Sequence, residues 1–278
     1  GVVLYNAGIG TGSGWYFYRV PLKTPTGIEN GDRSVAPKAH LYDGRLSITG
    51  LDGRNTIKAF EVGDIRIAVK RFRRPNLFQA FIYTFFRRSK ARRSYEHAVR
   101  LRALGIDSPE PIAWSEYRRN GLITETYFVS RRSDYAPLTA ATERFPTSDS
   151  LPVLEAFARF TVRLHEKGIC HEDFNQTNIL WRHDEATGRY DFQLIDINRM
   201  KFLRRPLRPD ECMINLRRLS CPAVAFLYIL DRYAETRQWD MDDTLLRGTF
   251  FRLLFGRRQQ FKKRFRERKL AAAGKKQG

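Results

Sequence analysis

One short stretch of the sequence combines residue types that can move a proton and bind a metal ion. His171, Asp173 and Asn178 follow the spacing H-x-D-x4-N, and Asp196 comes 18 positions after Asn178. A carboxylate can accept the proton of an attacking hydroxyl, while an amide oxygen and a second carboxylate can hold Mg²⁺ on nucleotide phosphates. The spacing therefore favours phosphoryl transfer, with Asp173 as the proton acceptor and Asn178 and Asp196 as metal ligands. The alternative is a polar turn in which these side chains cap backbone groups.

The elements that would position these residues can be predicted from the surrounding pattern. Residues 179–181 and 190–195 are strand-like, and a polar turn at 183–189 joins them into a hairpin. The second strand of this hairpin carries Asp196 back to the rim formed by the preceding loop. A helix predicted over 150–167, which a glycine ends, leads the chain into that loop.

A second group of candidate residues lies in the first half of the chain. A strand predicted over 65–70 ends in Lys70, whose ammonium group would reach nucleotide phosphates. A helix predicted over 89–104 contains Glu96, which would pair with this lysine and fix its position. The alternatives are a surface lysine in a basic stretch, and a glutamate that pairs with an arginine four positions away on its own helix.

Taken in order, these residues resemble the catalytic set of a kinase. The sequence is similar to the lipopolysaccharide core kinases, the Kdo/heptose kinase family of Gram-negative bacteria, over roughly residues 45–235. Four segments carry the similarity: Lys70-Arg-Phe-Arg-Arg, Arg92-Arg-Ser-Tyr-Glu96, Leu104-Gly-Ile-Asp-Ser-Pro-Glu-Pro111 and His171-Glu-Asp-Phe-Asn-Gln-Thr-Asn-Ile-Leu180. The resemblance implies ATP-dependent, Mg²⁺-assisted phosphorylation of a Kdo or heptose hydroxyl on the lipid A–core saccharide. It places the enzyme in the cytoplasm, peripheral on the inner membrane, and gives catalytic roles to Asp173, Lys70, Glu96 and His171.

The expected fold class is α+β, a bilobal protein-kinase-like fold. The small lobe would hold a five-stranded antiparallel sheet with one main helix, and the large lobe would be mostly helical. Strands are expected at 46–48, 56–60, 65–70, 111–117 and 122–130, and further helices at 212–236 and 242–256, with a break at Cys221-Pro222. The expected divisions are an N-terminal segment without an assigned role, the N-lobe, the C-lobe and a basic tail: 1–43, 44–131, 132–256 and 257–278.

Two further segments are candidates for nucleotide contacts. A turn over 50–55 contains Gly50 and Gly53 and would cover the nucleotide, although two glycines alone are a weak signal. Residues 130–137, beginning with Ser130, would form the hinge whose backbone meets adenine. We expect Lys70 and the three loop residues to converge on one cleft that holds ATP.

The positive charge of the chain is concentrated in two segments. Residues 71–93 hold eight Arg or Lys and no acid, and residues 247–278 hold twelve with one Glu, so together they carry 19 of the net +20. Residues 75–86, which arginines flank on both sides, place aromatic side chains at helical spacing. This pattern is typical of an interfacial membrane helix. The alternative is a helix packed on the small lobe. We expect both basic segments to contact an anionic membrane surface, and no nucleic acid.

The loop departs from regulated protein kinases at several positions. Glu172 stands where those enzymes carry Arg, and Asn175 stands where many carry a Lys that neutralises the transferred phosphoryl group. No A-P-E motif follows Asp196, which disfavours a protein substrate. This leaves Mg²⁺, Lys70 or Arg199 as the source of the positive charge, and we hypothesise Arg199.

Three rival interpretations remain from the sequence. A soluble kinase of the aminoglycoside or choline kinase type would share the loop residues but not need two basic–aromatic segments. A nucleic-acid-binding protein would explain the charge but not the loop spacing, and a pseudokinase scaffold is disfavoured by the complete residue set. We expect no transmembrane helix, because the chain has no run of 18 apolar residues. We also expect no signal peptide, because the apolar opening Gly1-Val-Val-Leu has no charged region before it and no long hydrophobic run after it. The three cysteines lack metal-ligand spacing.

Overall fold

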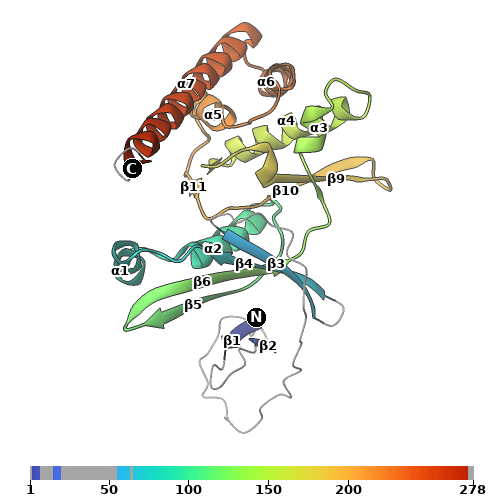
Figure 1. Cartoon of the computed structure of the whole chain (residues 1–278). Coiled ribbons are helices and arrows are strands. Elements are labelled where there is room, and N and C mark those ends of the chain that lie inside the picture. Colours follow the sequence, from blue (N-terminus) through green and yellow to red (C-terminus); the bar gives the residue numbers. More distant parts are fainter. Residues whose placement is uncertain (1, 7–14, 20–54, 63–64, 275–278) are drawn as a thin grey trace. The chain divides into compact units, whose positions relative to one another are not determined.

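The chain forms two compact units, Gly1–Asp134 and Tyr135–Gly278. The computed structural model describes residues 2–6, 15–19, 55–62 and 65–274, and each unit is considered by itself (Figure 1). The predicted strand at 46–48 and the glycine turn with Gly50 and Gly53 lie outside these residues.

The first unit is built on an antiparallel sheet with two helices. In the part of the chain that the structure describes, this sheet has the strand order β3-β4-β6-β5. Its strands are β3 (Asn55–Val62), β4 (Ile65–Phe72), β5 (Pro111–Arg119) and β6 (Leu122–Arg131), and its helices are α1 (Leu77–Phe85) and α2 (Lys90–Ala103). A separate antiparallel pair comprises β1 (Val2–Asn6) and β2 (Trp15–Arg19). The predicted strands from residue 56 onward and both predicted helices are confirmed, within a few residues at their ends.

Local sequence explains the register of this sheet. Asn120 and Gly121 both have positive φ, 50° and 77°, and join β5 to β6 in the two-residue turn whose twist suits a hairpin. Ile67, Ala113 and Val129 on three neighbouring strands form a buried cluster, because alternate residues of a strand face the same side. The turn therefore fixes the pairing of β5 with β6; on the other side of β6, Phe128 is the register partner of Lys70 on β4.

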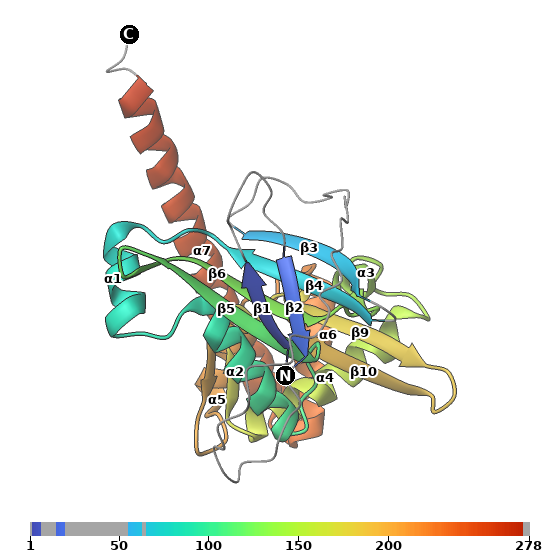
Figure 2. The same ribbon diagram turned by 90° about the horizontal axis from the view of Figure 1, so that it is seen from below.

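The two helices of this unit are covered to different degrees. α2 begins at the N-cap Ser89, packs on β5 and β6, and buries Ala91, Ala98 and Leu101. α1 contacts β6 and buries only Ala80, and Figure 2 shows it beside one end of the β5–β6 hairpin. A hydrogen bond connects α1 to β6: the Oγ1 of Thr84 on α1 accepts from the backbone N–H of Ile123 on β6 at 3.0 Å.

The second unit is mostly helical and contains a three-stranded and a two-stranded antiparallel sheet. The helices are α3 (Thr139–Glu143), α4 (Ser150–Glu166), α5 (Pro209–Leu216), α6 (Ala223–Arg237) and α7 (Met241–Gly274). β9 (Ile179–Asp184) pairs with β10 (Arg189–Leu194) and with β7 (Ala136–Pro137), while β8 (Ile169–His171) pairs with β11 (Met200–Phe202). The predicted hairpin, the helix over 150–167 and the break at Cys221-Pro222 are confirmed. α7 runs without interruption past residue 256, so the expected last core helix and the first part of the basic tail are one helix.

Helix α4 forms the centre of this unit. Its buried Phe157 contacts Phe174 and Phe192, with ring centroids 5.9 and 5.8 Å apart, and the helix packs against α6. At its end Gly168 has a φ of +70°, and a Cβ there would come within 2.4 Å of the Arg205 carbonyl oxygen. Glycine is therefore required where the chain turns from α4 into β8 and toward His171.

Within the described residues, every helix is too short or too polar to cross a bilayer. The three cysteines are free thiols; Cys212 and Cys221 are buried, and Cys170 is half-buried.

Candidate active site

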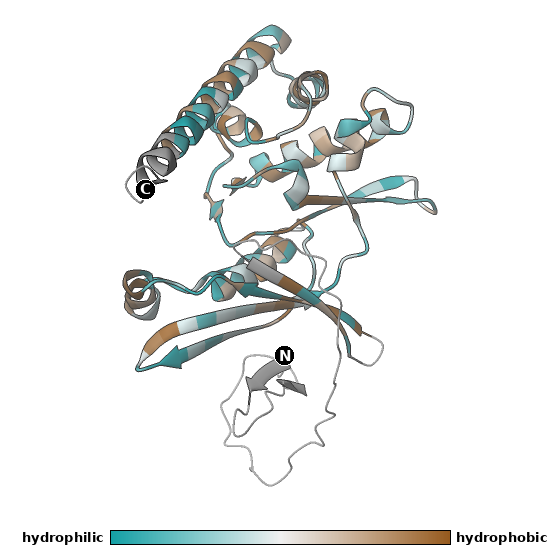
Figure 3. Cartoon of the chain, in the orientation of Figure 1, coloured by the Kyte–Doolittle hydropathy of each residue, from teal (hydrophilic) through white to brown (hydrophobic). Residues whose placement is uncertain are grey.

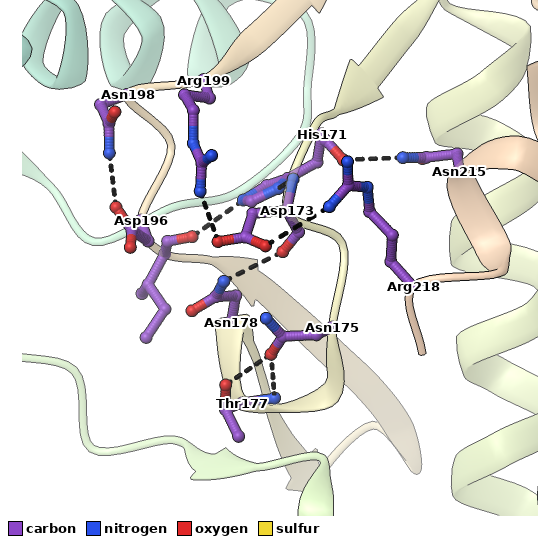
Figure 4. A network of polar contacts seen from close by, with 11 residues as sticks. His171, Asp173, Asn175, Thr177, Asn178, Asp196, Asn198, Arg199, Asn215 and Arg218 are labelled. Atoms are coloured by element: carbon purple, nitrogen blue, oxygen red, sulfur yellow. Dashed lines mark hydrogen bonds and ion pairs between the residues drawn. The ribbon is translucent and has the colours of Figure 1, made fainter. Parts of the chain in front are cut away.

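The loop that follows β8 is anchored by one aromatic side chain. Phe174 is fully buried against Phe157 of α4, so the residues on either side of it are held at the surface of the unit. A short 3-10 turn, Gln176–Asn178, closes the loop, and the Asn175 side chain caps it by accepting a hydrogen bond from the Thr177 N–H at 2.9 Å. Figure 4 shows Asp173 and Asn178 on this loop, with Asp196 close by.

His171 joins the loop to the segment that carries Asp196. Its Nδ1 accepts a hydrogen bond from the Asp173 N–H, so its Nε2–H donates to the Ile195 carbonyl, both at 3.0 Å. Burial lowers the pKa of His171 below its ordinary value, which keeps the ring neutral and suits this donor–acceptor pattern. His171 thus acts as a positioning residue, because it fixes the backbone on both sides of the site.

Asn178 and Asp196 are oriented by short contacts of their own. The Asn178 Nδ2 donates to the Asp173 carbonyl at 3.0 Å, which directs the amide oxygen to the other side. The Asn178 carbonyl accepts from the Ile195 N–H at 3.0 Å, and Asp196, with a φ of 53°, receives a hydrogen bond from Asn198 Nδ2. An amide oxygen and a carboxylate are the hard oxygen ligands that Mg²⁺ prefers.

This pair of ligands would leave room for phosphate in a metal's shell. In the described part of the chain, no group of three or more His, Cys, Asp or Glu side chains could hold a metal. Mg²⁺ usually keeps several waters and shares its shell with substrate phosphates rather than filling it with protein ligands. The residues present therefore fit a magnesium–nucleotide complex.

Two arginines approach the carboxylate predicted to accept the proton. Arg199 Nη2 lies 2.7 Å from Asp173 Oδ2, and Arg218 Nη1 lies 3.9 Å from Oδ1. Arg199 comes from the turn after Asp196, as the sequence suggested, whereas Arg218 follows α5. Sequence reasoning missed Arg218 because 45 positions separate it from Asp173 and nothing local marks it.

Glu172 is also paired in the structure. Its carboxylate lies 2.6 Å from Lys201 Nζ on β11, and its N–H donates to the Arg199 carbonyl at 2.9 Å. The hydrogen bond from Lys201 lowers the pKa of Glu172 and raises that of Lys201. The acid that stands in place of the protein-kinase arginine therefore binds the loop to β11.

A buried polar chain supports the loop from behind. Asn215 of α5 donates to the His171 carbonyl at 2.7 Å, and its Oδ1 lies 3.0 Å from His165 Nε2. The other ring nitrogen of His165 lies 3.0 Å from the hydroxyl of Tyr233 on α6. Because Asn215 Oδ1 can only accept, His165 donates through Nε2 and accepts from the tyrosine. Three helices are thereby connected to the backbone of the catalytic loop.

The candidate residues of the first unit lie on its central strands and on α2. Lys70 Nζ on β4 is 5.2 Å from the ring centroid of Phe72. The Glu96 carboxylate forms ion pairs with Arg88 at 2.7 Å and with Arg92 at 3.0 Å. Partial burial favours a higher pKa for Glu96, but hydrogen bonds and charge from these arginines outweigh it, so the pKa falls below its ordinary value.

The arginine pairing foreseen as an alternative for Glu96 is thus present, and the pair with Lys70 stays a prediction. Ser130 lies in β6 opposite Ala68 and is buried. The convergence of Lys70 with the loop of the second unit stays a prediction as well.

Comparison of the sequence with family models gives a match to the lipopolysaccharide kinase (Kdo/WaaP) family over residues 55–238. No curated protein matches the chain. Among solved structures, one described as WaaP in complex with acyl carrier protein has a TM-score of 0.51 at 16% identity, over 77% of this chain and 87% of that one. An aminoglycoside-3'-phosphotransferase of type VIII has a TM-score of 0.48 at 16% identity, over 71% of this chain and 87% of that one. The PknI kinase domain of Mycobacterium tuberculosis has a TM-score of 0.38 at 17% identity, over 70% and 74%.

The likeness to the WaaP structure confirms the predicted α+β, protein-kinase-like fold class. The family match spans the stretch from β3 to the end of α6 and so includes every candidate residue that the structure describes. The chain therefore belongs to the lipopolysaccharide kinase (Kdo/WaaP) family.

Proposed function

We propose that the protein transfers the γ-phosphoryl group of ATP to a hydroxyl of a Kdo or heptose residue in the lipopolysaccharide inner core. The family match makes the chain a phosphotransferase of lipopolysaccharide biosynthesis. One observation carries the site: His171 bridges the Asp173 N–H and the Ile195 carbonyl, which holds the two carboxylate-bearing segments together. A polar turn that merely caps backbone groups would not explain why two arginine side chains approach the Asp173 carboxylate.

The residues of the loop account for the chemical step. Asp173 accepts the proton of the acceptor hydroxyl as its oxygen attacks the γ-phosphorus in line with the departing ADP. His171 stays neutral and holds the Asp173 backbone, while Arg199 orients the Asp173 carboxylate. Most of the acceleration comes from this positioning and from positive charge near the transferred group.

The nucleotide is assigned to residues of both units. Asn178 and Asp196 would hold Mg²⁺, which neutralises charge on the phosphates when it is bound. Lys70 is the proposed contact for the α- and β-phosphates, with Glu96 supporting it, and Gly50, Gly53 and Ser130 are the proposed contacts for the rest of ATP.

A membrane-facing role is proposed for α1 and for the basic part of α7. Figure 3 shows the apolar character of α1, and its side chains Leu77, Phe78, Phe85 and Phe86 are at least 63% exposed. Arginines flank this helix on both sides, and each basic residue near an anionic bilayer contributes about 1 kcal/mol. These features support the proposal that the enzyme attaches to the cytoplasmic face of the inner membrane. Acyl carrier protein, which is bound in the WaaP structure, is the alternative partner we propose for this surface.

The decisive experiment supplies labelled ATP and the lipid A–core fraction of the source organism to the full chain. Wild-type protein is expected to label the saccharide, and Asp173→Asn, which keeps the shape but not the basicity, is expected to reduce the rate by at least about 100-fold. Mass spectrometry then locates the phosphate. Labelling of an aminoglycoside or choline in place of the saccharide would reject the proposal.

A further inference from the structure

Two adjacent arginines are held against one aromatic ring beside the active site. Arg217, the C-cap of α5, and Arg218 have their guanidinium carbons 5.3 and 5.4 Å from the ring centroid of Phe255 on α7. Such cation–π contacts restrict the side chains without neutralising them. The two guanidinium groups are therefore held in defined positions beside the ring.

This pair carries more positive charge than its surroundings balance. Arg218 shares the single carboxylate of Asp173 with Arg199. Within the part of the chain that the structure describes, the Arg217 side chain forms no ion pair, and its Nε is buried without a hydrogen-bond partner. Burial, followed by the charges of Arg218 and of Arg258 on α7, lowers the pKa of Arg217. A half-buried cluster of like charges is costly unless an anion joins it.

The position of the cluster indicates which anion it serves. Figure 4 shows Arg218 approaching Asp173 from the side opposite to Asp196. The nucleotide phosphates belong on the side of Asn178 and Asp196, so the arginine side is left for the molecule that presents its hydroxyl to Asp173.

We propose that Arg217 and Arg218 form a subsite for an anionic group of the acceptor, a carboxylate or a phosphate, next to the hydroxyl that is phosphorylated. This inference rests on the proposed function and extends it to acceptor choice. A Kdo residue carries its own carboxylate, whereas a heptose is neutral and would need a phosphate already present on the saccharide. Guanidinium groups recognise both anions through paired hydrogen bonds.

Steady-state kinetics of the full chain test the subsite. Arg217→Gln removes a charge without touching the Asp173 carboxylate and is expected to raise the acceptor KM about tenfold, as expected for one charge-assisted hydrogen bond. Arg258→Gln removes a neighbouring positive charge and should raise the acceptor KM less. The KM for ATP should stay within about twofold. Arg217→Lys should recover part of the loss. Arg163→Gln is the matched control, because Arg163 also lies over a phenylalanine ring, at 6.0 Å, but on α4 and exposed to solvent. Its acceptor KM should not change.

Acceptor saccharides with and without their phosphate groups identify the source of the anion. If the Arg217→Gln defect persists with enzymatically dephosphorylated saccharide, the anion is the sugar carboxylate; if it disappears there, the anion is a phosphate. An acceptor KM within twofold of wild type in both variants overturns the subsite. The same conclusion follows if the variants weaken only vesicle binding, because the arginines then belong to a membrane surface.

A binding measurement separates this inference from the proposed function. Inorganic phosphate should raise the unfolding midpoint of wild type and Arg163→Gln more than that of an Arg217→Gln/Arg258→Gln double variant. If no saccharide is phosphorylated but this difference is seen, the acceptor assignment fails while the anion site stands. If saccharide is phosphorylated and phosphate stabilises all variants equally, with unchanged acceptor KM, the subsite alone is rejected.

Discussion

At the scale of single residues, the most informative contact is the one between Arg199 and Asp173. The sequence suggested that Arg199 neutralises the transferred phosphoryl group, and the structure places its guanidinium 2.7 Å from the proposed base. An arginine on that carboxylate can turn to the phosphoryl oxygens as charge develops there. The two roles are compatible because a guanidinium has donors enough for both partners.

We predict that Arg199→Ala lowers kcat about 100-fold with saturating ATP and acceptor, which is the loss expected when one preorganised charge contact is removed. Arg199→Lys should retain part of the activity. Lys201→Ala provides the control, since Lys201 pairs with Glu172 rather than with Asp173. Full turnover by Arg199→Ala at saturating substrates would show that the residue has no such role.

A second residue-scale prediction concerns His165. Burial is the main cause that lowers its pKa from 6.5 to about 4, opposed by the Asn215 hydrogen bond and aided by the charge of Arg237. The unfolded chain therefore binds a proton that the folded chain excludes between about pH 6.5 and 4, and stability falls as the pH drops through that window.

Urea denaturation at pH 7 and pH 5 measures this effect. His165→Gln should lose about 2 kcal/mol less stability than wild type over that interval, because one buried histidine no longer contributes. His171, whose pKa is lowered in the same direction, remains in both proteins and cancels from the comparison. Equal losses in the two proteins would mean that folding does not lower the pKa of His165.

At the scale of elements, periodicity and breakers predicted most of the framework. The β9–β10 hairpin, α4 and α2 were predicted because their apolar spacing, turn residues and caps are local signals. The end of α7 was predicted too early because Gly256, a residue type that disfavours helix, lies inside it, and the basic stretch after Gly256 shows little apolar periodicity. Local sequence signals thus predict the presence of helices and strands more reliably than the end of a solvent-exposed helix.

The support of the site could not be predicted in the same way. Asn215 and His165 are separated by 50 positions, and His165 and Tyr233 by 68. Each residue alone is an ordinary polar or aromatic position on a helix. Only the packing of α4, α5 and α6 turns them into a chain that reaches the His171 carbonyl.

Helix α1 gives a prediction at this scale. Leu77 and Phe78 are 82% and 73% exposed, so serine in either place should leave the unfolding midpoint nearly unchanged. Each substitution should weaken partitioning onto anionic vesicles about tenfold, because roughly 1.5–3 kcal/mol of apolar burial is lost. Val224→Ser on α6, at a position 56% exposed, is the control in a sedimentation assay. Unaltered partitioning of both α1 variants would remove this helix from the membrane contact.

At the scale of the whole molecule, the unequal distribution of charge is the leading feature. Two segments carry 19 of the net +20, so the rest of the chain is nearly neutral. We expect an anionic surface to attract these two segments more strongly than it attracts the rest of the chain.

We predict that raising NaCl from about 50 mM to about 500 mM weakens binding to anionic vesicles at least about tenfold, since the screening length falls well below its value of about 10 Å at 0.1 M. Turnover of a water-soluble saccharide fragment should change far less over the same range. Binding that ignores salt, or that is equally strong on neutral vesicles, would argue against an electrostatic attachment.

The continuity of α7 has a mechanical consequence. A helix of 34 residues is a rod about 50 Å long, and the stretch around Phe255, which braces two arginines beside the proposed base, lies partway along it. The helix is continuous from that brace to the lysine- and arginine-rich end. A partner that binds the basic end of α7 would therefore also change the orientation of the helix that supports the proposed acceptor subsite. Attachment and alignment of the acceptor would then be mechanically coupled.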